Sequence, residues 1–94
     1  MKMSDRYLEH FDKYNDEKYC LAAVKKDGYA LGYIHNQTDK ICLAAAKENG
    51  YALPYVHNQT DKICLAAVKE DAGALGFIHD RHRLIWCMIK LGLI

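Results

Sequence analysis

Two residue types that bind metals recur along this chain at fixed intervals. The series are Cys20, Cys42, Cys64 and His35, His57, His79, each with a 22-residue spacing, and Cys87 follows 23 residues after the third cysteine. Thiolates and imidazoles are the ligands that zinc takes most often in proteins. A Cys/His metal site is therefore the first chemistry to weigh, and its feasibility depends on the elements that carry the two series.

The whole central part of the chain shares this period. Residues 16–37, 38–59 and 60–81 are three copies of one unit. The first copy matches the second at 14 of 22 positions, and the second matches the third at 13. Such a period is typical of a stacked array, in which each unit buries its apolar face against its neighbours. The sequence predicts an all-α, solenoid-like array within a single domain, residues 1–94.

Stacking argues against the metal site. Packed helices lie about 8–10 Å apart, so equivalent residues of successive units are separated by about that distance. Zinc needs donor atoms about 2.0–2.3 Å from one centre, and a disulfide needs Cα atoms within about 7 Å. We predict no metal and no cofactor, and we interpret the cysteines as core thiols. A metal or redox site shared between two chains remains the alternative.

The first half of each unit predicts an α-helix. Its N-cap positions hold Asp16, Thr38 and Thr60. An acidic residue follows each cap, where the helix dipole favours negative charge. Residues 41–46 are apolar all round, which suits a helix flanked by neighbours on both sides. Gly28 and Gly50 are expected to end these helices in the left-handed conformation.

The second half predicts a helix of only one or two turns. One of its positions is occupied by Gly32, Pro54 and Gly76 in the three units, and both residue types disfavour helix interiors. Bulky residues recur around it: Tyr29, Leu31, Tyr33 and Ile34, then Tyr51, Leu53, Tyr55 and Val56. We expect all these residues to pack over the alanines of the long helix. The tyrosines are therefore interpreted as core residues, with a ligand cage as the alternative.

The repeated pattern [D/E]-K-x-C-L-A-A-[V/A]-K-x-[D/N]-G-Y-A-L-x-Y-[I/V] resembles family 4116 of the domains of unknown function over residues 16–81. The most specific part is LAAVK followed by G-x-A-L-x-Y. The resemblance implies tandem helical repeats, which occur in large DNA viruses, amoeba-associated bacteria and mobile elements, and it implies no catalytic residue. The third unit departs from the pattern at Ala72 and Gly73, which puts its turn in question.

Composition restricts the class of partner. The chain carries 13 basic and 12 acidic residues, without a long run of either sign, so neither nucleic acid nor an anionic membrane is expected. The charged N-terminus has no apolar signal-peptide stretch, which predicts a cytoplasmic protein with reduced thiols. The apolar C-terminus is shorter than the roughly 20 residues that span a bilayer.

Catalysis needs unlike groups that converge at one point. This chain instead distributes like groups at equal spacing, and Ser4 is its one serine. We predict no enzymatic activity and assign no catalytic residue. The histidines are interpreted as residues at the end of the short helix, where a ring complements the helix dipole. The alternative is an imidazole ladder that binds an acidic partner more tightly as the pH falls.

The repeat breaks at both ends. Residues 1–15 read as a charged half-repeat that caps the array. Residues 82–94 predict a final helix, capped by Asp80 and ended by Gly92, that is too apolar for an outer cap. Either this helix is sunk into the array beneath the N-terminal segment, or an apolar strip with Trp86 remains outside as an interface.

These observations predict a non-enzymatic protein that binds another protein. The resemblance to repeats from viruses and mobile elements suggests an inhibitor of a host defence protein. A homodimer that assembles through the C-terminal helix is the alternative. The candidate contact residues are Trp86, Leu84, Met88, Ile89, Arg81 and Arg83 near the C-terminus, and Lys40, Lys62, Glu48 and Glu70 on the long helices.

Overall fold

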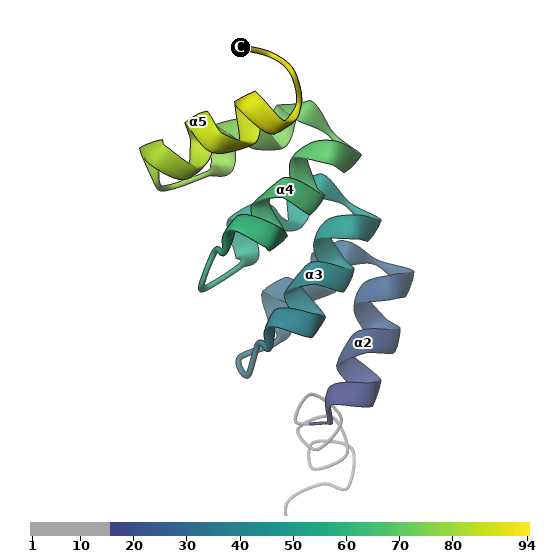
Figure 1. The fold of residues 1–94 in the computed structure, drawn as a ribbon. Helices are drawn as coiled ribbons and strands as arrows, with labels where there is room; N and C mark the ends of the chain where they lie inside the picture. The colour runs from purple at the N-terminus through teal and green to yellow at the C-terminus, as the bar shows by residue number, and fades with distance from the viewer. Residues whose placement is uncertain (1–15) are drawn as a thin grey trace, which may run out of the picture.

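The computed structural model describes residues 16–94, and in this part of the chain every regular element is a helix (Figure 1). Four α-helices alternate with three short 3₁₀-helices. The α-helices are α2 (Glu17–Lys26), α3 (Asp39–Glu48), α4 (Asp61–Glu70) and α5 (Arg81–Lys90), and the 3₁₀-helices are η1 (Gly28–Tyr33), η2 (Gly50–Tyr55) and η3 (Ala72–Phe77). The predicted all-α array is confirmed. The N-terminal cap predicted for residues 1–15 lies outside the described residues.

The long helices begin where the sequence predicts. Asp16 accepts a hydrogen bond from the backbone N–H of Lys18. The hydroxyl of Thr38 accepts one from Ile41 and also donates one to Glu17 of the preceding unit, at 3.2 and 3.3 Å. Each cap therefore satisfies an orphan N–H group of its own helix, and the cap of α3 also binds the neighbouring helix.

The long helices end differently from the prediction. α2 and α3 stop at Asp27 and Asn49, whose backbones are extended and whose side chains cap the next 3₁₀-helix. Gly28 and Gly50 are the first residues of those 3₁₀-helices, and neither has a positive φ angle. The left-handed conformation expected for both glycines is wrong, because a polar cap in extended backbone turns the chain instead.

These two glycines are required by close packing between units. A Cβ atom on Gly28 would lie 3.0 Å from the carbonyl oxygen of Ala45 in the next long helix. On Gly50 it would collide with the equivalent oxygen, that of Ala67. The third unit has Ala72 at this position and nevertheless forms the same turn. Its turn, which the sequence put in question, is therefore retained, and the glycine is absent where the following helix, α5, lies in a different register.

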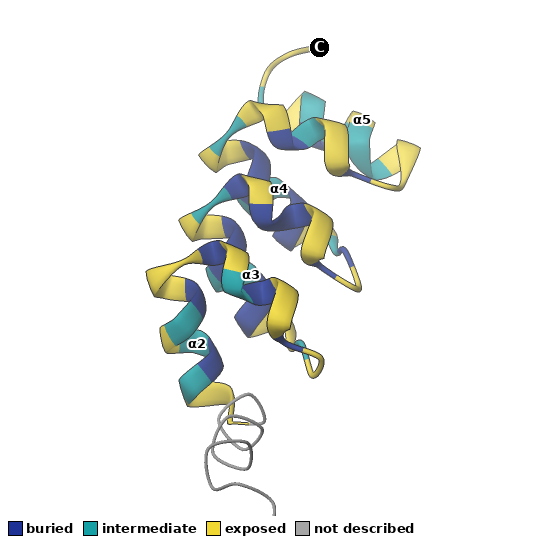
Figure 2. Cartoon of the chain, turned by 180° about the vertical axis from the view of Figure 1, so that it is seen from behind, coloured by how far each residue is buried: buried dark blue, intermediate teal, exposed yellow. Residues whose placement is uncertain are grey.

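The units stack in chain order into an array of 59 × 21 × 17 Å, with α2 and α5 at opposite ends (Figure 1). Each long helix packs on the next, and the short helices form a second row beside them. Figure 2 shows similar successions of buried and exposed positions in α3 and α4. The core is thus continuous through the units, as expected for a repeat array.

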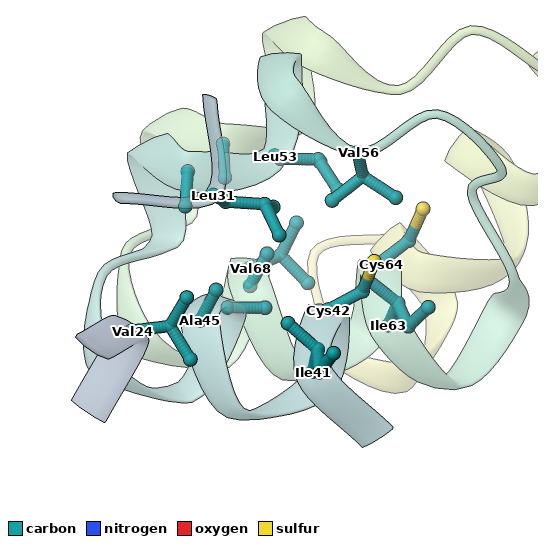
Figure 3. Packing of buried hydrophobic residues seen from close by; sticks show 14 of the residues in the cluster. Val24, Leu31, Ile41, Cys42, Ala45, Leu53, Val56, Ile63, Cys64 and Val68 are labelled. Atoms are coloured by element: carbon teal, nitrogen blue, oxygen red, sulfur yellow. The ribbon is translucent and has the colours of Figure 1, made fainter. Parts of the chain in front are cut away.

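Buried side chains come from both halves of each unit. Figure 3 shows Leu31 and Leu53 of the short helices above Val24, Ala45 and Val68 of the long helices. The core residues with essentially no exposed surface include Val24, Leu31, Ala45, Leu53, Ala67 and Val68. Small residues of the long helix are therefore covered by the leucine of the short helix, as the sequence predicts.

The last helix is shifted relative to the repeat. The carboxylate of Asp80 accepts hydrogen bonds from His82 and Arg83, so α5 begins two residues earlier than the 22-residue period would place it. The 22-residue period would place residue 86 at the position of the buried cysteines. Because the helix is shifted, Cys87 is the buried residue at this end of the array. The helix ends at Gly92, with φ 77° and the paired hydrogen bonds of a Schellman motif, which confirms both predicted boundaries.

Candidate functional site

The four cysteines lie in the core. Cys20, Cys42, Cys64 and Cys87 are all buried as thiols, and Figure 3 shows Cys42 and Cys64 beside Ile41 and Ile63. Burial, assisted by the negative charge of Asp39, raises the pKa of Cys42 to about 11. Burial likewise raises the pKa of Cys64 to about 11. Since the thiolate is the reactive and metal-binding form, these groups are poorly suited to nucleophilic or metal chemistry at neutral pH.

The histidine series does not meet the cysteine series. His35, His57 and His79 are exposed and lie just beyond the C-caps of the short helices, as the helix-end interpretation expects. Within residues 16–94, no group of three or more His, Cys, Asp or Glu side chains is arranged to hold a metal ion.

A glutamine that sequence reasoning missed binds successive units together. The side-chain amide of Gln37 donates to the carbonyl oxygen of Leu31 in its own unit, at 3.2 Å, and to that of Tyr55 in the next, at 2.8 Å. Its oxygen accepts the backbone N–H of His57 at 2.9 Å and the thiol of Cys42 at 3.3 Å. The cysteine register thus supplies a weak donor to this network.

The same network recurs one unit later. Gln59 donates to Phe77 at 2.9 Å and accepts from His79 at 3.1 Å and from Cys64 at 3.8 Å. The equivalent residue of the third unit is Arg81, and the helix that follows it, α5, does not continue the repeat. The signal was present in the sequence: a glutamine repeats at a position that reads as a loop, and it disappears in the last unit.

The long helices present one surface with a regular composition, which we call the lysine–leucine face. In each of the three helices a leucine lies between two lysines, at i, i+3 and i+7, which places them on one side of the helix. The face comprises Lys18, Leu21, Lys25, Lys40, Leu43, Lys47, Lys62, Leu65 and Lys69. All six lysines are exposed and all three leucines are partly exposed. The 22-residue period therefore repeats an amphipathic surface as well as a core.

Two equivalent grooves cross this face, one between each pair of neighbouring long helices. The α2–α3 groove has a volume of about 340 Å³ and the α3–α4 groove about 320 Å³. Leu43 and Lys47 line both. Leucine and alanine side chains form the floor, and three lysines with one glutamate form each rim. Each groove therefore has an apolar floor and a rim of net positive charge.

The structure places the four predicted long-helix residues on these rims. Lys40 and Glu48 line the α2–α3 groove, and Lys62 and Glu70 line the α3–α4 groove. The sequence identified these four residues as candidate contact residues but missed the leucines beside them. Each leucine belongs to an apolar run that was expected to be buried between neighbouring helices.

The predicted C-terminal residues divide into two groups. Leu84 and Trp86 pack against the core, and Lys90 Nζ lies 5.5 Å from the centre of the Trp86 ring. Arg83 is tied to Asp61 by an ion pair of 2.8 Å. Met88 is partly buried, whereas Ile89 and Arg81 are exposed. Of the two alternatives for this helix, an exposed apolar strip is observed, but Ile85 and Ile89 form it and Trp86 does not. The covering N-terminal segment of the other alternative lies outside the described residues.

The tyrosines are not core residues. Tyr29, Tyr33, Tyr51 and Tyr55 all lie at the surface of the short-helix row, so the core interpretation is wrong. Edge-to-face contacts join successive units: the Tyr29 and Tyr55 ring centres are 6.0 Å apart, and those of Tyr51 and Phe77 5.8 Å. Leucine already fills the space above the alanines, which leaves the rings to pair outside it.

None of the helices within residues 16–94 combines the length and apolar character that crossing a bilayer requires. The family model for a domain of unknown function (DUF4116) matches residues 16–60. This stretch covers the first two units and confirms the family resemblance inferred from their sequence. No curated protein and no solved structure matches the chain.

Proposed function

We propose that this array, whose first two units match the DUF4116 family, is a non-enzymatic module that binds an acidic amphipathic segment of another protein. The observation that carries the proposal is the lysine–leucine face, with its two equivalent grooves. A partner helix with leucines flanked by glutamates would bury its apolar side on Leu21, Leu43 and Leu65 and pair its carboxylates with the lysines.

The chemistry of the face favours protein over other macromolecules. Partly exposed leucines along the centre of a basic surface lower the free energy of a complex only when the partner is also apolar there. The phosphate backbone of a nucleic acid has no such strip and is bound mainly through charge.

An amphipathic peptide that carries glutamates at i and i+4 around a leucine strip tests the proposal directly. We expect the full chain to bind this peptide by fluorescence anisotropy, with an affinity that falls as salt is added. Lys47→Glu reverses the charge shared by both grooves and should weaken binding about fivefold to tenfold.

Lys26→Glu is the matched control. It makes the same charge change outside the two grooves, and the second and third units already carry glutamate at this position, in Glu48 and Glu70. Equal losses for the two variants, or tighter binding of a single-stranded oligonucleotide than of the peptide, would refute the proposal.

A second candidate function is self-assembly through the end of the array. Four apolar residues at this end are exposed: Ile85, Ile89, Leu93 and Ile94. Ile85 and Ile89 are four residues apart and so share one side of α5. Two copies could bury these strips against each other. Native mass spectrometry should then show a dimer that Ile89→Glu converts to a monomer, whereas a wild-type monomer at high protein concentration would exclude this function.

The narrower hypothesis, an inhibitor of a host defence protein, rests on the family resemblance and remains a prediction. Expression in a host challenged with phage or plasmid tests it, and unchanged immunity would count against it. A cytoplasmic location belongs to the same proposal. It is supported by four buried thiols that form no disulfide, as expected of a reducing compartment.

A further inference from the structure

A hollow lined with aromatic rings lies between the first two short helices. Its lining residues are Asp27, Tyr29, Gly32, Tyr33 and Tyr55, and its volume is about 330 Å³. This is at the lower end of the range of small-molecule sites, roughly 300–1,000 Å³. The three tyrosines are 46%, 71% and 44% exposed in chain order, so their rings are accessible to a ligand.

The rings meet as the walls of a corner. The planes of Tyr29 and Tyr55 are perpendicular, at 88°, with centres 6.0 Å apart. Gly32 keeps the Tyr55 side close, because a Cβ atom there would lie 3.3 Å from the ring. Tyr33, from the same short helix as Tyr29, is the third aromatic group.

A carboxylate completes the lining. Oδ1 of Asp27 accepts the backbone N–H of Tyr29 at 3.0 Å, which fixes the side chain at the start of the short helix. The faces of aromatic rings carry partial negative charge and attract organic cations, most effectively when several rings surround the ligand. A fixed carboxylate beside three tyrosines adds a full negative charge to this attraction.

We propose that this hollow binds a quaternary-ammonium group. A primary ammonium has three N–H donors that lose water on binding and need acceptors, and the hollow offers one carboxylate, with one oxygen already engaged. A trimethylammonium group has no N–H donors, so it exchanges water for ring faces without leaving a donor unpaired. The expected ligand is therefore a fully methylated ammonium group, carried either by a free small molecule or by a trimethylated lysine.

The second unit provides an internal comparison. Its equivalents of Asp27 and Gly32 are Asn49 and Pro54. The carboxylate is thus replaced by a neutral amide that still caps the helix, through a 2.9 Å hydrogen bond to Tyr51, and the glycine is replaced by a ring. The third unit keeps an acid, Asp71, but has glycine in place of the first tyrosine. The full set of groups occurs at the junction of the first two units, where Tyr55 of the second unit completes the lining.

The test is a titration of the ¹⁵N-labelled full chain with tetramethylammonium chloride, followed by NMR and compared with sodium chloride at equal ionic strength. We expect saturable shifts at residues 27–33 and at Tyr55. Asp27→Asn introduces the cap of the second unit and should weaken binding at least about fivefold, because it removes the charge and retains the fold. Gly32→Pro, also taken from the second unit, should abolish binding by filling the hollow.

Asp71→Asn is the control, since it makes the same charge and cap change at a unit without the tyrosine. It should leave the affinity unchanged. Choline and a trimethyllysine peptide then distinguish the two sources of the cation, and tighter binding of either one supports the site. Shifts that do not saturate, equal losses for Asp27→Asn and Asp71→Asn, or equal affinity for methylammonium would overturn the proposal.

Discussion

Single atoms decide how closely the units approach. The glycines that open the first two short helices lie directly beneath the next long helix, and the contact leaves no room for a side chain. Their repetition therefore reflects a distance between units rather than an unusual backbone conformation, since neither has a positive φ angle. Gly76, in the third short helix, is different, because a methyl group added there would have no neighbouring atom within 4 Å.

We expect Gly50→Ala to lower the free energy of unfolding by roughly 1–3 kcal/mol, because the methyl group would overlap the carbonyl oxygen of Ala67. Gly76→Ala should instead raise it by about 0.4–1 kcal/mol, since alanine fits and restricts the unfolded chain. Urea denaturation of both variants measures the difference. If Gly50→Ala were as stable as Gly76→Ala, the close approach would be wrong.

The glutamine network makes a second prediction at this scale. Gln59→Leu would keep the approximate volume but remove the partners of the His79 N–H and the Phe77 carbonyl. Because each buried group left unsatisfied costs about 1–3 kcal/mol, we expect a total loss of roughly 2–4 kcal/mol in urea denaturation.

The control for this substitution is Arg81→Gln, at the equivalent position of the third unit. It should change stability by no more than about 0.5 kcal/mol, as is usual for exposed sites. A small effect at residue 59, comparable to that at residue 81, would show that the glutamine does not bind the units together.

Among the elements, α5 differs from the other long helices in register, partners and exposure. Its early start at Asp80 rotates Cys87 into the core and places Trp86 partly against it. The ion pair between Arg83 and Asp61 then ties the helix to α4. The final helix thus closes one end of the core and leaves Ile85 and Ile89 exposed.

Trp86→Ala is expected to destabilise the fold by about 2 kcal/mol, less than the 3–5 kcal/mol of a fully buried tryptophan, because the ring is only partly buried. Ile89→Ala, on the exposed strip, should leave folding nearly unchanged and reduce self-association if that occurs. Chemical denaturation combined with light scattering separates the two effects. A Trp86 variant with normal stability and weaker association would restore the indole as the interface residue.

At the scale of the whole molecule, the junctions between units are nearly interchangeable. Each consists of a long helix on a long helix, a glutamine network and an edge-to-face aromatic pair. Stability of such arrays is approximately a sum over units and nearest-neighbour interfaces.

Deletion of residues 38–59 joins Gln37 to Thr60 and recreates a junction of the same type. We expect this shorter chain to fold cooperatively, with a urea m-value lower by roughly a quarter to a third, because less surface is exposed on unfolding. Deletion of residues 38–48 alone removes one long helix and should abolish cooperative unfolding. Loss of the fold in the full-unit deletion would mean that the junctions are not equivalent.

The periodic sequence by itself determined the all-α array, the N-caps of the long helices, the burial of the cysteines and the two boundaries of the last helix. Caps and apolar runs are local signals that extend over a few residues, and the period repeats them three times. Local rules are therefore sufficient to predict these features. Exposure of Lys40, Lys62, Glu48 and Glu70 followed for the same reason.

Only the tertiary structure decided which side chains lie between units and which lie outside. Leu31 and Tyr29 both have bulky, largely apolar side chains. Leu31 is buried and Tyr29 is exposed, and this difference depends on the position of the next unit. The same holds for the glutamine networks, the role of Gly50, the outward face of Leu43 and the hollow beside Asp27. Each of these is set by atoms about one period away in the sequence, and the distances between units do not follow from local propensity.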